Sequence, residues 1–427
     1  MGSSPHSSAS RHHDAQQMQS RNPSGKVLYL CTTFPRLSET FVEREVRHLI
    51  HSVRLQPISL WKGGEAQDIP VQKMPIAGLF SLFWRIPRWL IRNPAGLFRI
   101  LESVIRRFPR SFLNLQETLL GTGMGIVLAD QVYDSPPKWI HCIWATAPAT
   151  TAWTIHHLTG APYSFGAHAY DLFQDGGDCL LREKIASAAW IRTSTQAAAE
   201  ELVRRGAPAE KVCLIRRGLQ QLPTPTHPRK EGTTLRLLSI GRLVAKKGYP
   251  EFLRLCAALR ERGIVFQATI IGDGPLREEI ENTLHELHLT DQVQLTGALP
   301  REEVEPFFGQ SDLFVFTGVI SKDGDRDGLP NVVPEALAHG LPVLVRPAPG
   351  VLEAITDGET GVVFEGDDPS QWADSLLAVW NDYPKRLQLS KNGRRWVEDH
   401  FLSRDNTQQL AEKILSSQTV LPRRSQP

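Results

Sequence analysis

Short apolar runs alternate with helical segments along most of this chain. Such runs stand at 26–31, 139–144, 235–240, 268–271 and 313–316. A strand that is apolar along its whole length is buried on both faces, which is typical of parallel sheets covered by helices on both sides. Parallel strands also need crossover connections, which are right-handed. The alternation therefore predicts an α/β fold built from parallel sheets.

A proline-rich stretch interrupts the alternation and divides the chain. Residues 221–233 contain Pro223, Pro225 and Pro228 and few apolar side chains, which predicts a linker. We therefore expect an N-terminal domain at 26–220 and a second domain at 234–395, facing each other across a cleft. Residues 1–25 are rich in Ser, His, Gln and Arg without an apolar core, which predicts a disordered leader and not a signal peptide. A disordered tail is expected at 417–427.

Composition and cysteine usage narrow the function classes. The chain has 427 residues, a formal net charge of +2 and 22% charged residues, as is ordinary for a globular protein. It carries no zinc-finger, RNA-binding or basic-zipper signature, so no nucleic-acid partner is expected. Its five cysteines are widely spaced and odd in number, which predicts reduced thiols and a cytoplasmic location. No apolar run reaches the length of a membrane span.

One segment, residues 76–116, has a different character. Between 79 and 110 it interleaves aromatic and aliphatic residues with seven arginines, opposed only by Glu102. Basic helices with Trp and Phe on the other face suit an anionic membrane surface. A pair of core helices with a solvated arginine face would give the same pattern. Pro87, Pro94 and Pro109 are expected to divide the segment into short helices.

The stretch 323–340 predicts a ligand site. It follows an apolar run at 313–316 and ends in a helix with Asn331 as N-cap, Pro334 in the first turn and Gly340 as the stop. Asp327 in the loop and Glu335 near the helix start would then lie at the carboxyl ends of parallel strands, where open α/β sheets bind ligands. The loop amides at 328, 329 and 331 and the helix N-terminus offer donors to a phosphate. Carboxylates beside phosphate donors suit a nucleotide sugar.

Two metal patterns overlap this stretch. Asp323, Asp325 and Asp327 imitate a calcium loop, but the twelfth position holds Pro334 and not the required glutamate. Asp323-Gly-Asp325 also matches the Asp-x-Asp of metal-dependent sugar transferases, a motif too short to decide. We expect no metal site, and we expect Asp323 and Asp325 to lie in a solvated loop.

Further candidates stand at other strand ends. Arg242 and Lys247 follow one strand and can meet a diphosphate, although a solvated basic loop would look the same. His168 could donate to an oxygen or act as an acid or base, or it could be structural. Ser38 and Glu39 precede a helix and would face the cleft or form a local turn. The turn at Gly272-x-Gly274 lacks the third glycine of a dinucleotide site, which argues against nicotinamide and flavin cofactors.

Several motifs together resemble glycosyltransferase family 4. Residues 235–385 carry Gly-Arg-Leu, Lys-Lys-Gly248, Gly-Asp-Gly-Pro-Leu, Leu-Thr-Gly297 and Gly-Leu-Pro-Asn-Val-Val-Pro-Glu335. The first half resembles the exopolysaccharide, colanic-acid-type branch through Phe34-Pro-x-Leu-Ser-Glu-Thr-Phe41, Ala147-Pro-Ala-Thr150 and Ala167-His-Ala-x-Asp171. The resemblance implies the GT-B fold, in which two Rossmann-like domains face across a cleft and a C-terminal helix crosses back to the first. Residues 396–416 would form that helix.

The resemblance also implies roles. Arg242, Lys247 and the loop Gly328, Leu329, Pro330 and Asn331 would hold the donor phosphates, Asp327 the transferred sugar, Glu335 the ribose and His168 the sugar from the other domain. Ser38, Glu39 and Asp171 are acceptor-side candidates. The family retains the anomeric configuration without metal, and the departing phosphate oxygen takes the acceptor's proton. Asp327 replaces the usual glutamate, and Thr317-Gly318 the usual Pro-Ser.

The predicted function is transfer of a sugar from a nucleotide sugar to a glycan or lipid-linked saccharide in exopolysaccharide synthesis. The protein would work in the cytoplasm or on the inner face of the plasma membrane. Two alternatives stay open, a non-catalytic GT-B nucleotide-binding module and a GT-B nucleotide-sugar epimerase.

Overall fold

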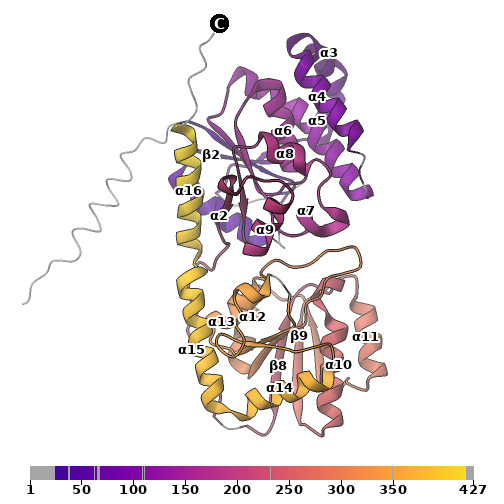
Figure 1. Cartoon of the computed structure of the whole chain (residues 1–427), viewed down its shortest axis with the longest axis vertical. Helices are drawn as coiled ribbons and strands as arrows, with labels where there is room; N and C mark the ends of the chain where they lie inside the picture. The colour runs from indigo at the N-terminus through magenta and orange to yellow at the C-terminus, as the bar shows by residue number, and fades with distance from the viewer. Residues whose placement is uncertain are drawn as a thin grey trace, which may run out of the picture.

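The computed structural model describes residues 25–419, except 37–38, 62, 65–67, 108, 110, 231 and 349. It contains two parallel sheets, one in each half of the chain (Figure 1). The first has the order β3-β2-β1-β4-β5-β6-β7, and the second has the order β10-β9-β8-β11-β12-β13. Every pair of neighbouring strands is parallel, so the predicted α/β fold is confirmed.

The first half contains seven strands. They are β1 Val27–Cys31, β2 Leu55–Ser59, β3 Gln72–Lys73, β4 Trp139–Cys142, β5 Tyr163–Gly166, β6 Trp190–Thr193 and β7 Val212–Leu214. Its helices are α2 Thr40–Ser52, α3 Leu82–Arg92, α4 Pro94–Arg106, α5 Phe112–Asp134, α6 Ala147–Thr159, α7 Tyr170–Phe173, α8 Leu181–Ser187 and α9 Gln196–Arg204. Alternate residues of β1 enter two different cores, Leu28 and Leu30 on one face and Val27 and Tyr29 on the other. This explains why the strand is apolar throughout.

The second half has six strands. They are β8 Leu235–Ile240, β9 Phe266–Ile271, β10 Val293–Gly297, β11 Leu313–Phe316, β12 Val343–Val345 and β13 Val362–Val363. Its helices are α10 Tyr249–Glu261, α11 Arg277–Glu286, α12 Arg301–Gln310, α13 Val332–Ala338, α14 Pro369–Asn381 and α15 Tyr383–His400, and α16 Ser403–Thr419 follows them.

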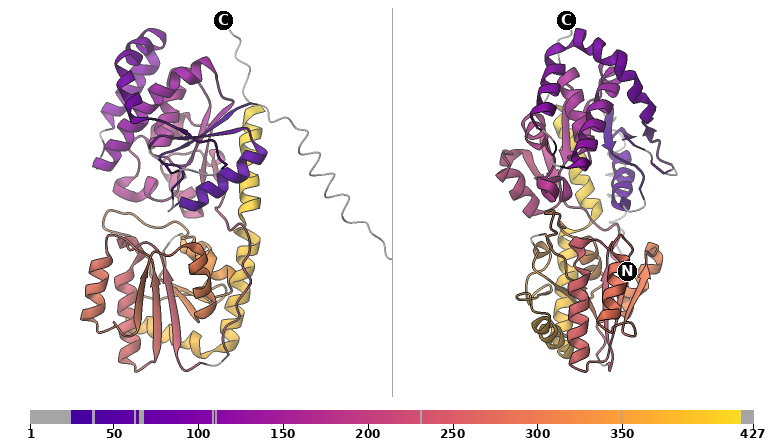
Figure 2. Two further views of the ribbon diagram at one scale, coloured as in Figure 1. Left: turned by 180° about the vertical axis from the view of Figure 1, so that it is seen from behind. Right: turned by 90° about the vertical axis from the view of Figure 1, so that its right-hand side faces the viewer.

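The C-terminal helix crosses back to the first half, but its predicted bounds were wrong. The chain forms α15 up to His400, bends at Phe401, and begins α16 at Ser403. Trp396 packs with the core of the second half, whereas Leu410, Ala411 and Ile414 are buried against the first. Figures 1 and 2 show α16 running beside the first half as a continuation of α15. The bend lies beside the linker, because Leu219 exchanges backbone hydrogen bonds with Phe401 and Ser403.

Helices α3, α4 and α5 lie on the far side of the first half from α16 (Figures 1 and 2). Asn93 separates α3 from α4, and its side chain accepts a bond of 2.9 Å from the Gly96 amide. Pro94 occupies the first turn of α4, as predicted. Pro87, however, lies inside α3 and does not divide it. Both Pro87 and Phe83 are exposed, so the Phe83 carbonyl that loses its helical bond can be hydrated.

Candidate functional site

The stretch 323–340 connects the end of β11 to α13, as the sequence predicts. Asn331 stands at the N-cap position, but its side chain makes no capping hydrogen bond. Helix α13 has only seven residues, so its dipole contributes less than expected to an anion site. Glu335 lies in its first turn. The loop residues Gly328, Leu329, Pro330 and Asn331 lie between the two carboxylates, as placed by the sequence.

Two neighbouring lysines hold the aspartates of the loop. Lys247 Nζ lies 2.6 Å from Asp327 Oδ2, and Lys246 Nζ lies 2.9 Å from Asp325 Oδ2. Lys246 also approaches Asp327 Oδ1, at 3.8 Å. Asp325 is therefore paired and mostly buried, and its assignment to a solvated loop was wrong. Lys246 was missed, because its partner lies 79 residues away in the sequence.

The lysine loop is fixed against the end of β11. Gly248 has φ +66, and a Cβ there would lie 1.9 Å from the Thr317 carbonyl oxygen. Thr317 Oγ1 donates to the Gly248 carbonyl at 2.7 Å. A side chain at 248 would therefore push Lys246 and Lys247 away from the aspartates. Arg242, by contrast, is exposed and forms no ion pair with a described residue, so its guanidinium is open to a ligand.

Asp327 and Glu335 line different cavities. Glu335 lines a cavity of about 680 Å³ between the halves, together with Arg44 of α2, Arg301 of α12 and residues 219–223. Burial raises the pKa of Glu335, while Arg301 and Arg44 counteract this rise. Asp327 lines a cavity of about 330 Å³ with Thr195 and other residues of the first half. Two separate sites for the carboxylates suit an extended ligand with two hydroxyl-bearing parts.

The loop also contacts the first half through Asp323. Its side chain is exposed, as predicted, but Oδ2 accepts a bond of 3.2 Å from Gln174, and its carbonyl accepts one of 2.9 Å from the Asp175 amide. A hydrogen bond from Ser321 lowers the pKa of Asp323. Asp323 thus helps to join the halves.

His168 lies at the end of β5, buried beside Trp144, whose ring centroid is 5.3 Å away. Its Nδ1 is 3.1 Å from Ser194 Oγ, and its Nε2 has no hydrogen-bond partner among the described residues. Burial, and then Arg217 and Arg192, lower the pKa of His168 well below its usual range. The imidazole is therefore neutral at neutral pH, which suits a hydrogen-bonding role better than that of a charged acid.

The three acceptor-side candidates differ in their surroundings. Asp171 is buried, and its carboxylate accepts hydrogen bonds from the amides of His168, Ala169 and Ala145. In this position the carboxylate stabilises the loop after β5, and the role of Asp171 as an acceptor-side residue stays a prediction. Glu39 is half-buried and pairs with Arg36 at 3.2 Å. Ser38 lies outside the described residues.

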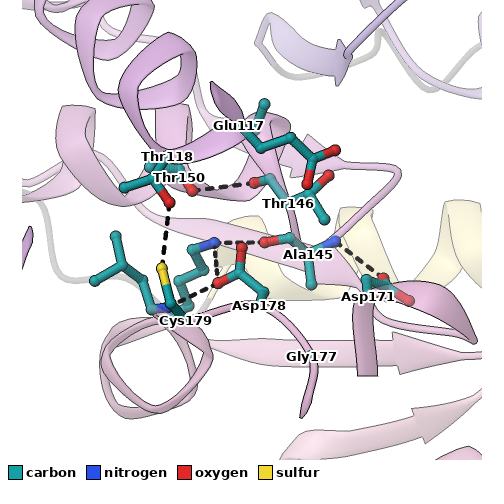
Figure 3. Close-up of polar contacts among 12 residues, drawn as sticks. Glu117, Thr118, Ala145, Thr146, Thr150, Asp171, Gly177, Asp178 and Cys179 are labelled. Carbon is teal, nitrogen blue, oxygen red and sulfur yellow. Dashed lines mark hydrogen bonds and ion pairs between the residues drawn. The ribbon is translucent and has the colours of Figure 1, made fainter. Parts of the chain in front are cut away.

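A polar cluster near these loops was missed altogether (Figure 3). Glu117 of α5 accepts a bond of 3.5 Å from Tyr170, whose hydroxyl lies 3.2 Å from Thr146. Asp178 forms an ion pair of 2.6 Å with Lys184, and Lys184 also donates to the Ala145 carbonyl. Nothing in the sequence distinguishes Glu117 from a glutamate on a helix surface, because its burial depends on loops 30 to 60 residues away.

Glu117 should make stability depend on pH. Burial, and then Asp178, raise the pKa of Glu117 from 4.5 to about 7. The folded state then binds this proton more tightly than the unfolded state does. Its contribution to the free energy of unfolding is therefore complete below pH 4.5 and is lost as the pH rises to 7. We expect the free energy of unfolding of Glu117→Gln, relative to that of the wild type, to rise by about 2–3 kcal/mol between pH 5 and pH 8. Urea unfolding measures this difference.

Glu261→Gln, at an exposed position of α10, is the matched control and should show no such gain. A parallel pH dependence of the wild type and Glu117→Gln would contradict the raised pKa of Glu117.

The architecture is that of the GT-B fold. The structure of Anabaena Alr3699/HepE in complex with UDP and glucose superposes with a TM-score of 0.67 at 16% identity, covering 92% of this chain and 100% of that one. Residues 225–396 match the model of the family "Glycosyl transferases group 1".

Relatives of similar sequence are named for polysaccharide synthesis. The amylovoran biosynthesis glycosyltransferase AmsK of Erwinia amylovora is 31% identical over 218 residues, which cover 50% of this chain and 52% of that protein. WcaL of Escherichia coli, named for colanic acid biosynthesis, is 29% identical over 221 residues, 51% of this chain and 53% of that protein. The chain thus matches about half the length of these relatives.

The described residues contain neither a membrane-spanning helix nor a cluster of metal-binding side chains. No helix there is both long and apolar enough to cross a bilayer. No group of three or more His, Cys, Asp or Glu side chains in the same part of the chain could hold a metal ion.

Proposed function

We propose that this protein transfers a sugar from a nucleotide sugar to a saccharide acceptor in surface polysaccharide synthesis, with retention of configuration as in family 4. The observation that carries the proposal is the pairing of Lys247 with Asp327 beside the exposed Arg242, at the carboxyl ends of the second sheet. The relatives named for polysaccharide synthesis and the neighbour holding UDP and glucose support it.

Donor binding would rearrange the ion pair between Lys247 and Asp327. The diphosphate would attract Lys247 and Arg242. The loop amides at Gly328, Leu329 and Asn331 would add hydrogen-bond donors, and Pro330 would fix the loop. Asp327, released from Lys247, would accept hydrogen bonds from the sugar hydroxyls, and Glu335 would accept those of the ribose in its own cavity. His168, as a neutral imidazole, would meet the sugar from the first half.

The transfer step needs no general base from the protein. The bond from the anomeric carbon to the phosphate oxygen breaks, and the acceptor oxygen bonds to the same face of the sugar. The acceptor's proton passes to the departing phosphate oxygen. Arg242 and Lys247 would stabilise the charge on that phosphate, so we propose that no metal cofactor takes part.

The proposal is tested with a panel of nucleotide sugars. We expect one of them to raise the Tm, because a ligand of the folded state stabilises it, and to be consumed when a saccharide acceptor is added. Chelator should leave the rate within about twofold if no metal takes part. Binding without turnover would indicate a nucleotide-binding module, and isomerised donor without acceptor an epimerase. A panel that never raises the Tm would sink the proposal.

We further propose that the protein binds the cytoplasmic face of an anionic membrane through α3 and α4. Both helices expose large apolar side chains, which are 87% exposed at Phe83, 84% at Ile91 and 60% at Phe98. Such a patch exceeds what single scattered apolar residues present. Arg99 and Arg106 on the same helices are exposed and supply the positive charge.

The arginines of α3, in contrast, gather around one carboxylate. Arg85, Arg88 and Arg92 all lie within ion-pair distance of Asp130 on α5, and Arg92 also stacks on Tyr133 at 4.8 Å. Changing them to glutamate would place negative charges against Asp130 and unfold this corner. They are therefore unsuitable for testing membrane binding.

We expect Phe83→Ser/Ile91→Ser/Phe98→Ser to lower partitioning into anionic vesicles at least tenfold, because each change removes roughly 1.5–3 kcal/mol of apolar burial. Co-sedimentation measures it, and wild-type binding should weaken with salt. Val265→Ser/Leu387→Ser, at exposed apolar positions of the second half, is the control. Equal partitioning of the wild type and the triple variant would exclude α3 and α4 as the contact.

A further inference from the structure

A cavity of about 740 Å³ lies in the first half, apart from the residues assigned to the donor. It forms where the end of α4, the start of α5, the loop 176–179, α8 and α9 meet. We call it the arginine cavity, since its lining includes Arg106, Arg107, Arg182, Arg204 and Arg205. Only two acidic side chains, Asp178 and Glu201, share the lining.

Carboxylates just outside the lining neutralise two of the arginines, because Arg106 pairs with Glu102 at 2.9 Å and Arg107 pairs with Glu183 at 2.7 Å. Lys184 already neutralises Asp178, at 2.6 Å. Arg204 and Arg205 share the single carboxylate of Glu201. Arg182 is exposed and forms no ion pair in the described part of the chain. Guanidinium forks suit phosphate oxygens, so the surplus charge favours a phosphorylated ligand.

Two exposed apolar side chains stand close in the sequence to lining residues of the arginine cavity, and we call them the apolar rim. Ile105 adjoins Arg106 and is 65% exposed, and Phe112, two residues before Asn114, is 72% exposed. A phosphate bound by the arginines could therefore carry a hydrocarbon chain that lies along the rim.

The arginine cavity also adjoins the predicted sugar site. Arg204, Arg205 and Glu201 line both this cavity and the smaller one that contains Asp327. A molecule held by its phosphate in the first cavity would extend its next group toward Asp327.

We propose that the arginine cavity binds the phosphate or diphosphate that joins a saccharide acceptor to a lipid anchor. The inference rests on the proposed sugar transfer and adds the class of acceptor. The lipid would lie against Ile105 and Phe112, its phosphates would meet the arginines, and its saccharide would point to the cleft.

The test uses two probes, inorganic pyrophosphate and farnesyl diphosphate, titrated by calorimetry into the full chain. The background variant Arg242→Ala/Lys247→Ala prevents the probes from binding at the donor site. In this background, Arg182→Ala/Arg204→Ala should lower the affinity for both probes at least about tenfold, because the loss of each charge-assisted hydrogen bond costs this much. Arg54→Ala/Lys230→Ala removes the same charge from exposed positions outside the cavity and should change either affinity by less than about twofold. Equal affinities in the two double variants would overturn the site.

The apolar rim is tested separately. Farnesyl diphosphate should bind at least about tenfold more tightly than pyrophosphate, and Ile105→Ser/Phe112→Ser should abolish this advantage while pyrophosphate binding stays. Equal affinity of the two probes for the background variant would mean a soluble phosphate ligand and would overturn the lipid-linked acceptor. Titration of nucleoside diphosphates into Arg182→Ala/Arg204→Ala, in which Arg242 and Lys247 are intact, reports on the donor site alone, so failure of the proposed function is seen independently.

Discussion

Asp327→Ala is expected to lower kcat by about 10²–10³ while the affinity for the nucleoside diphosphate stays or rises slightly. Asp327 would accept hydrogen bonds from the sugar, whose charge develops only as the bond to phosphate breaks, so its loss acts mainly on the transition state. The same change frees Lys247, which pairs with Asp327 at 2.6 Å in the absence of ligand. An unpaired Lys247 holds a diphosphate at least as well.

Glu335→Ala should give the opposite pattern, with KM raised about tenfold or more and kcat changed less. The ribose alters little during the reaction, so a carboxylate that binds it contributes equally to ground and transition states. Because the two carboxylates line separate cavities, the structure separates their expected roles more clearly than the sequence does.

Steady-state kinetics and calorimetry with the free nucleoside diphosphate distinguish the two roles. Asp291→Ala, at an exposed position of the same half, is the control and should match the wild type. Asp327→Glu should keep partial activity and change the preference among sugar epimers, because its carboxylate reaches further into the pocket. Loss of nucleotide affinity in Asp327→Ala with loss of turnover alone in Glu335→Ala would reverse the assignment.

The sequence predicted the fold well because the relevant signals are local. The continuous apolar strands, such as 27–31, are explained by cores on both faces, and this pattern needs no knowledge of distant contacts. The bend at Phe401, in contrast, was missed because it has no local signal in the sequence. Its position depends on hydrogen bonds with Leu219, far away in the sequence.

The site was predicted less completely. The strand–loop–helix that carries Asp327 and Glu335 could be read from spacing, but the partner of each charge could not. Lys246 with Asp325, and Lys247 with Asp327, are each about 80 residues apart. The arginines of α3 looked unpaired in the sequence because their partner, Asp130, lies on another helix, 45 residues from Arg85.

The buried pair of Asp178 and Lys184 should dominate the stability of the first half. The two side chains are 1% and 0% exposed, and Lys184 Nζ also donates to the Ala145 carbonyl at 2.6 Å. The pair thereby ties α8 to the loop between β4 and α6. In that loop Ala145 also donates to Asp171, and both contacts are visible in Figure 3.

Asp178→Ala should therefore cost about 3–5 kcal/mol, because it leaves an ammonium group buried with one carbonyl as partner. Lys184→Met should cost a similar amount, since the Asp178 carboxylate keeps only the Leu180 amide. The double variant should lose clearly less than the sum, because no uncompensated charge remains. Urea unfolding measures all three, and hydrogen exchange should show lost protection at 143–147.

Asp399→Ala provides the matched control, since Asp399 and Arg395 form an exposed pair at 3.8 Å and should contribute less than about 1 kcal/mol. If Asp178→Ala cost no more than this control, the Lys184 charge would have to be hydrated in the folded protein. The loop at Ala145 would then be held by Asp171 alone, and Asp171→Ala would become the change with the large effect. Additive single and double variants would lead to the same conclusion, because coupling between the charges requires that both are buried together.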